Sequence, residues 1–163
     1  MIARARQEGG FALIEMLIAI IVINIGLLAI LLALTSGVTT LRRSAETSTA
    51  SAVADRQLER YRALQFALIY LDTASLAAAD STYQADAAYS ASQVNLPCIP
   101  LAPACTPSQT VTGPDGRSYR VDTFIVWVTP GVGLPVKQVT VVVRNPGAPA
   151  TLARVVTTAG AIF

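Results

Sequence analysis

One uninterrupted apolar stretch near the amino terminus dominates the sequence. From Phe11 to Leu34, 24 residues include only two polar side chains, those of Glu15 and Asn24. As a helix this stretch would be about 36 Å long, enough to cross the hydrocarbon core of a bilayer with some tilt. A secretory signal peptide is a poor fit, because its apolar region is typically only about 7 to 15 residues long. The sequence therefore predicts a single-pass transmembrane helix.

The flanking charges do not orient this helix. Arg4 and Arg6 precede the apolar stretch, and Arg42 and Arg43 follow it closely. Because the positive-inside rule depends on an excess of Lys and Arg on one side, the count is a tie.

The composition argues against an enzyme. The chain contains no histidine, which excludes Ser-His-Asp and Cys-His catalysis and histidine-bound zinc. The net charge of +2 gives no basic surface for nucleic acid. We therefore expect no catalytic residue, no metal, no cofactor and no nucleic-acid partner. Five of the six aspartates lie scattered in polar, loop-like sequence, namely Asp72, Asp80, Asp86, Asp115 and Asp122.

Beyond the apolar stretch the chain becomes amphipathic, and it contains no proline before Pro97. The pattern predicts that the helix continues to about residue 71, so that residues 11–71 form one transmembrane and then amphipathic helix. An apolar stripe at helical spacing supports this, and we interpret it as core packing rather than a functional surface. The stripe consists of Tyr61, Leu64, Leu68 and Leu71.

Residues 72–163 are predicted to form a small head. Residues 72–116 show no sustained period and are expected to be a loop region that ends in a turn at 113–116. Apolar residues then alternate over 119–127 and 136–143, and 152–158 offers a third strand. Short connections predict an antiparallel meander with Trp127 in its core. The expected fold class is α+β, with the long helix packed on a small antiparallel sheet.

The chain has two cysteines, Cys98 and Cys105, in the proline-rich segment NLPCIPLAPACTP. A bond between them would close a loop of eight residues, which is sterically reasonable. A disulfide would require an oxidising compartment such as a periplasm or the cell surface. The alternative is a pair of free thiols.

The most specific motif is Gly10-Phe11-Ala12-Leu13-Ile14-Glu15, between a short charged segment and the apolar stretch. It resembles the processing site of type IV prepilins and type II secretion pseudopilins. The resemblance implies that residues 1–10 are a cytoplasmic leader, that prepilin peptidase cuts between Gly10 and Phe11, and that Phe11 is N-methylated. It also implies that the subunit is stored in the inner membrane with its head exported, and later lies in a pilus (fimbrium) at the cell surface.

Glu15 has a physical interpretation as well. A charged side chain in an apolar helix costs about 2.5 to 3.5 kcal/mol at the bilayer centre, so it is expected to have a partner. The ammonium group released at Phe11 of a neighbouring subunit could be that partner and would set the stagger of adjacent helices. The alternative is a carboxylate that reaches the membrane interface. Asn24 and Gly26 are equally compatible with helix–helix contact and with no role.

The segment EMLIAIIVINIGLLAILLAL is similar to minor pilins of the type IV pilus modification (PilV) class. Major pilins commonly carry a helix-bending proline, and residues 11–96 contain none. The expected function is therefore a structural subunit of the minor class. Its partners would be other pilin subunits, prepilin peptidase and the inner-membrane pilus assembly machinery. The alternatives are a pseudopilin of a type II secretion or DNA-uptake system and an unprocessed single-span anchor that carries a binding module.

Overall fold

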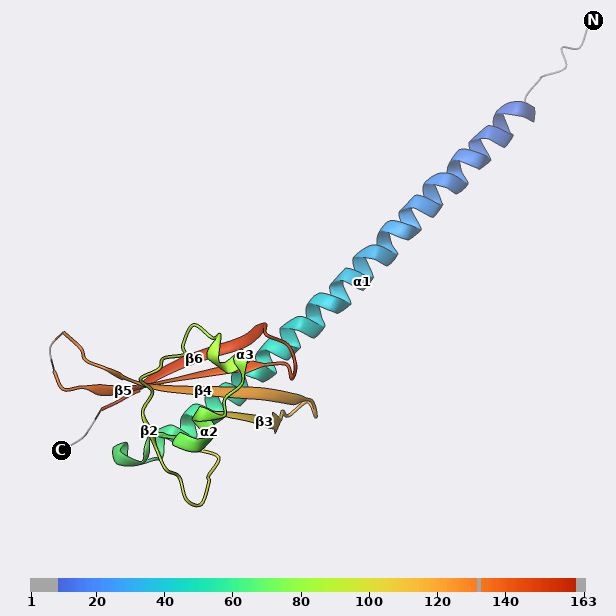
Figure 1. Ribbon diagram of the computed structural model, residues 1–163. Helices are drawn as coiled ribbons and strands as arrows, with labels where there is room; N and C mark the ends of the chain where they lie inside the picture. Colours follow the sequence, from blue (N-terminus) through green and yellow to red (C-terminus); the bar gives the residue numbers. More distant parts are fainter. Residues whose placement is uncertain (1–8, 132, 161–163) are drawn as a thin grey trace, which may run out of the picture. The chain divides into compact units, whose positions relative to one another are not determined.

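Helix α1 (Gly9–Arg62) is the longest element of the protein (Figure 1). The computed structural model describes residues 9–131 and 133–160, with side chains from residue 13 onward. The chain divides into two compact units, Met1–Ser44 and Ala45–Phe163, and α1 contributes residues to both.

In the first unit, the apolar part of α1 is exposed along its described length. The helix is long and apolar enough to span a membrane, and none of its most apolar window is buried by the rest of the chain. Asn24 satisfies its amide within its own helix, since its Nδ2 donates to the Ile20 carbonyl oxygen at 2.8 Å. A continuous exposed apolar surface of this size is unfavourable in water and is expected to lie in lipid or against other apolar surfaces. This agrees with the prediction of a transmembrane helix.

The second unit contains a four-stranded antiparallel sheet in the order β3-β4-β5-β6. Its strands are β3 (Ser108–Thr112), β4 (Ser118–Val128), β5 (Val136–Arg144) and β6 (Thr151–Ala159). The predicted α+β class and the meander of the last three strands are confirmed. Strand β3 was not predicted, because its sequence SQTVT is short and mostly polar and gives no alternating apolar signal.

The main core lies between one face of this sheet and the last turns of α1. Alternate residues of β4 and β5 point toward the helix, as the period of two in a strand requires. The helix contributes Ala50, Val53, Ala54, Leu58 and Tyr61, and the strands contribute Tyr119, Val121, Ile125, Val139, Val141 and Val143.

The other face of the sheet is covered by the segment that follows β1 (Leu71–Asp72). This segment contains α2 (Thr73–Ala77) and α3 (Ser81–Gln84), each with an aspartate at its N-cap, and leads to β2 (Asn95–Leu96). Its Tyr83 packs on Phe124 and Val142, and the rings of Tyr83 and Phe124 are stacked with centroids 4.4 Å apart. The prediction that residues 72–116 form only a loop region was therefore wrong, because its elements are too short to show a period.

The predicted extent of α1 was also wrong, because the helix ends at Arg62 rather than near residue 71. A 3₁₀ turn follows at Phe66–Leu68, and the Leu71 amide donates to the Val94 carbonyl oxygen in the pairing of β1 with β2. Leaving the helix lets Leu71 enter the core, while Leu68 remains 51% exposed. The four residues of the predicted apolar stripe therefore do not lie on one helix. Tyr61 lies on α1, and the other three lie in the segment that follows it.

Trp127 was expected in the core, but its side chain is 51% exposed. The ring makes an edge contact with Phe66, with centroids 5.9 Å apart, and Lys137 Nζ lies 5.4 Å from the ring centroid. Lys137 is held there by the backbone carbonyls of Phe66 and Ile69, at 2.9 and 2.8 Å. Trp127 therefore packs at the margin of the core, against residues that follow the end of α1.

Candidate functional site

The residues of the processing motif lie at the start of α1. The backbone of Gly10 and Phe11 is helical, and the side chain of Phe11 lies outside the described residues. Glu15 lies in the next turn and is exposed, among exposed apolar side chains such as Ile14 and Met16. The structure thus places a carboxylate on the surface of an apolar helix that is long enough to span a membrane.

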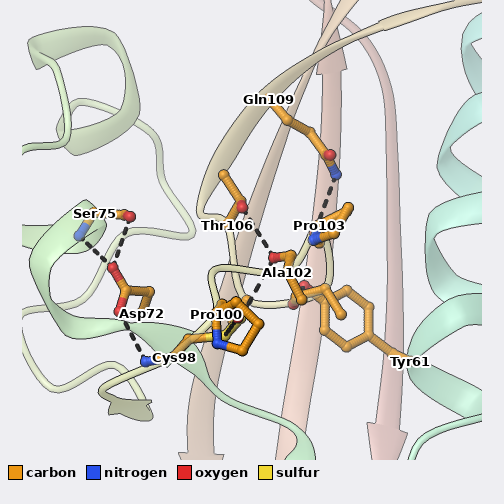
Figure 2. The surroundings of a disulfide bond; sticks show 11 residues. Tyr61, Asp72, Ser75, Cys98, Pro100, Ala102, Pro103, Thr106 and Gln109 are labelled. Carbon is orange, nitrogen blue, oxygen red and sulfur yellow. Dashed lines mark hydrogen bonds between the residues drawn. A yellow bond between two sulfur atoms is a disulfide. The ribbon is translucent and has the colours of Figure 1, made fainter.

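Cys98 and Cys105 form a disulfide, as predicted, and their Cα atoms are 6.5 Å apart. Figure 2 shows how Asp72 anchors one end of the closed loop. Its carboxylate accepts hydrogen bonds from the Cys98 amide at 3.0 Å and from Ser75 N and Oγ at 2.8 and 2.7 Å. These bonds, with the Cys98 amide as the largest contribution, lower the pKa of Asp72. The Asp72 amide in turn donates to the Cys105 carbonyl oxygen at 2.7 Å.

The other end of the loop is attached to α1. The Tyr61 hydroxyl donates to the Ala104 carbonyl oxygen at 2.5 Å, and burial raises the pKa of this tyrosine to about 12. The loop is therefore fixed to both the helix and β1, while its outer side exposes apolar residues. Ile99 is 92% exposed and Leu101 is also exposed, as is Leu96 at the end of β2, just before the loop.

We expect the Cys98→Ala/Cys105→Ala variant to lower the free energy of unfolding by about 2 to 3 kcal/mol, because an eight-residue loop is no longer closed in the unfolded chain. Trp127 is the only tryptophan and can report unfolding of this unit in denaturant. A reductant should destabilise the wild-type protein by a similar amount and leave the variant unchanged. Equal stability of wild type and variant would contradict this account of the loop.

A buried network of charges covers the second face of the sheet. Its centre is Arg144 on β5, whose side chain is 3% exposed and pairs with Asp122 on β4 and Asp86 in the covering segment. Arg154 on β6 also pairs with Asp86, at 2.9 Å. Burial by itself would raise the pKa of Asp86, but hydrogen bonds from the Ala88 amide and Arg154 outweigh it and lower the pKa.

The network continues along β4 through Arg120. Its Nε lies 2.9 Å from Asp122, and its NH1 lies 2.6 Å from Asp80, the N-cap of α3. The Arg120 guanidinium is the main reason that the pKa of Asp80 falls to about 2. The network therefore joins three strands to the covering segment.

The sequence interpretation missed this network, because it placed the aspartates from Asp72 to Asp122 in loop-like surroundings. Asp122 is instead fully buried within β4. The alternating pattern of β4 did contain a signal for this network. Arg120 and Asp122 occupy the positions between the alternating apolar residues, and Arg120 lies opposite Arg144 in the β4–β5 register. Two arginines directly opposite each other on neighbouring strands repel, so they are stable there only if carboxylates lie nearby.

Comparison with known proteins returns no match to any protein-family model, curated protein or solved structure. The structure itself defines the class of protein. It is an α+β chain with one amino-terminal helix apolar enough to span a membrane and a disulfide-bonded unit in which the end of this helix packs on an antiparallel sheet. These features are compatible with a pilin-like fold. Among the described residues, no group of His, Cys, Asp and Glu could hold a metal ion.

Proposed function

We propose that this protein is a structural subunit, of the minor class, of a type IV pilus. The observation that carries the proposal is the junction of Gly10-Phe11 with an apolar stretch, residues 11–34, whose single carboxylate, Glu15, lies one turn farther on. Neither a plain membrane anchor nor a core helix requires a diglycine or a carboxylate at this point. The exposed apolar surface of α1 and the disulfide in the second unit agree with a membrane-stored, exported subunit.

The proposed function has three steps, which are storage in the membrane, processing and assembly. The apolar helix holds the subunit in the inner membrane, prepilin peptidase removes residues 1–10, and Phe11 becomes the methylated amino terminus. In the filament, Glu15 neutralises the ammonium group of a neighbouring Phe11 and fixes the axial stagger of the two helices. Apolar side chains of α1, such as Leu17 and Ile21, then replace lipid contacts with contacts to other helices.

We expect Gly10→Val to block processing, because the peptidase must accept a small residue beside the membrane surface. The variant protein should keep its first ten residues, which intact mass spectrometry of the membrane fraction would detect. Gly37→Val is the matched control, because Gly37 lies on the same helix and a side chain there meets nothing within 4 Å.

The control should be processed like the wild type. A Gly10→Val protein that loses its leader and enters filaments would contradict the prepilin assignment. Normal processing of wild type and control together with an intact leader in Gly10→Val supports it.

A further inference from the structure

A groove in the second unit lies between α1 and the edge of the sheet at β3. Its volume is about 420 Å³, which is within the usual range for binding pockets. One wall is helical and the other is formed by β3, the turn that follows it and β4. The lining residues are Ala52, Val53, Arg56, Gln57, Arg60, Val111, Thr112, Pro114 and Val121.

Two arginines of this groove lack a carboxylate partner. Arg56 is exposed, and Arg60 donates only to the side-chain oxygen of Gln57, at 3.1 Å. Neither makes an ion pair with any described carboxylate. The other arginines of this unit all do, namely Arg62, Arg117, Arg120, Arg144 and Arg154. The groove is thus lined by two guanidinium groups that no ion pair neutralises, and its lining residues include no Asp or Glu.

Gln57 lies between these arginines in the sequence of α1 and supports one of them. The residue is 3% exposed, and its Oε1 accepts the hydrogen bond from Arg60. The charged groups that line the helical wall of the groove are therefore the two guanidinium groups, and they match a ligand that supplies carboxylate oxygens.

The other wall offers an open strand edge. Strand β3 is the first strand of the sheet and, among the described strands, pairs only with β4. The Thr123 amide donates to the Pro107 carbonyl oxygen, and the Gly113 amide donates to the Arg117 carbonyl oxygen. Because bonded pairs alternate in an antiparallel ladder, the backbone groups of Thr110 and Thr112 point to the outer edge. Such an edge can accept another strand.

We propose that this groove binds an extended acidic peptide segment of a partner protein. The segment adds to the open edge of β3, and its carboxylate lies between Arg56 and Arg60. Apolar side chains of the segment would contact Val53 and Val111. A free anion would use the arginines but not the strand edge or the apolar walls, so the combination favours a peptide. This inference does not depend on the pilus assignment.

The test uses the full-length protein in nanodiscs and a panel of fluorescent peptides of alternating valine and threonine, each with one glutamate at a different position. Fluorescence anisotropy measures binding. We expect at least one peptide to bind, and its affinity to fall by about tenfold or more when the glutamate is replaced by glutamine, a change of about 1.4 kcal/mol. Methylation of the backbone nitrogens on the edge-facing side of the peptide should weaken binding similarly.

Protein variants then locate the binding surface. Arg56→Gln/Arg60→Gln should weaken binding of the best peptide by about tenfold or more, whereas Arg62→Gln, on the same helix but outside the groove, should not. The fluorescence of Trp127 verifies that each variant is folded. The proposal is overturned if no glutamate peptide binds, if the double variant binds as tightly as the control, or if inorganic phosphate competes as strongly as the peptide.

Discussion

In the Glu15→Ala variant, the protein should accumulate normally in the membrane but fail to enter filaments. Removal of the charge makes membrane insertion of the helix easier by up to about 3 kcal/mol, and the cut between Gly10 and Phe11 remains possible. In the assembled state, however, a neighbouring ammonium group would be buried without its counter-charge, at a cost of about 3 to 5 kcal/mol. The ratio of this protein in sheared filaments to that in membranes should fall by roughly a hundredfold or more.

Glu59→Ala provides the matched control for this measurement. Glu59 lies on the same helix, is exposed, and pairs with Arg62 by an i,i+3 contact that should be worth only a few tenths of a kcal/mol. The control should therefore keep the wild-type ratio. An unchanged ratio in Glu15→Ala would contradict a role of Glu15 in assembly. It would favour either a carboxylate that reaches the membrane interface or a subunit at the end of the filament.

The second large effect is expected from Arg144→Leu, which should lower the free energy of unfolding by about 3 to 5 kcal/mol. Arg144 is the shared partner of Asp122 and Asp86, so its removal leaves two buried carboxylates with incomplete neutralisation. The apolar replacement retains bulk, which separates the charge effect from the effect of a cavity. Denaturant unfolding followed by Trp127 fluorescence would measure the change.

Arg117→Leu is the corresponding control, because Arg117 also makes an ion pair, with Glu46, but its side chain is 55% exposed. Exposed ion pairs contribute about 0 to 1 kcal/mol, so this variant should remain close to the wild type. Equal losses in the two variants would show that the buried network does not hold the covering segment on the sheet.

Several features of the fold could be predicted because each rests on a strong local pattern. The apolar stretch after Phe11 predicted a helix that could span a membrane, and the alternation around Ile125 and Val141 predicted two central strands. The spacing of Cys98 and Cys105 indicated a short closed loop, which the structure contains. Each of these signals lies within a short segment of sequence.

The features that were missed depend on contacts between distant segments. The end of α1 at Arg62 follows from the pairing of Leu71 with Asn95, which no local helix period reveals. The burial of Asp122 depends on an arginine 22 residues away. The unpaired arginines of the groove likewise become evident only when the partners of all the others are known.

The most direct test of the central claim is the amino-terminal structure of the mature protein. The protein would be isolated from membranes and from sheared filaments, and its intact mass and amino-terminal sequence determined. The account predicts a chain that begins at N-methylated Phe11 in both fractions. A chain that still begins at Met1 would contradict it and would identify an unprocessed membrane anchor.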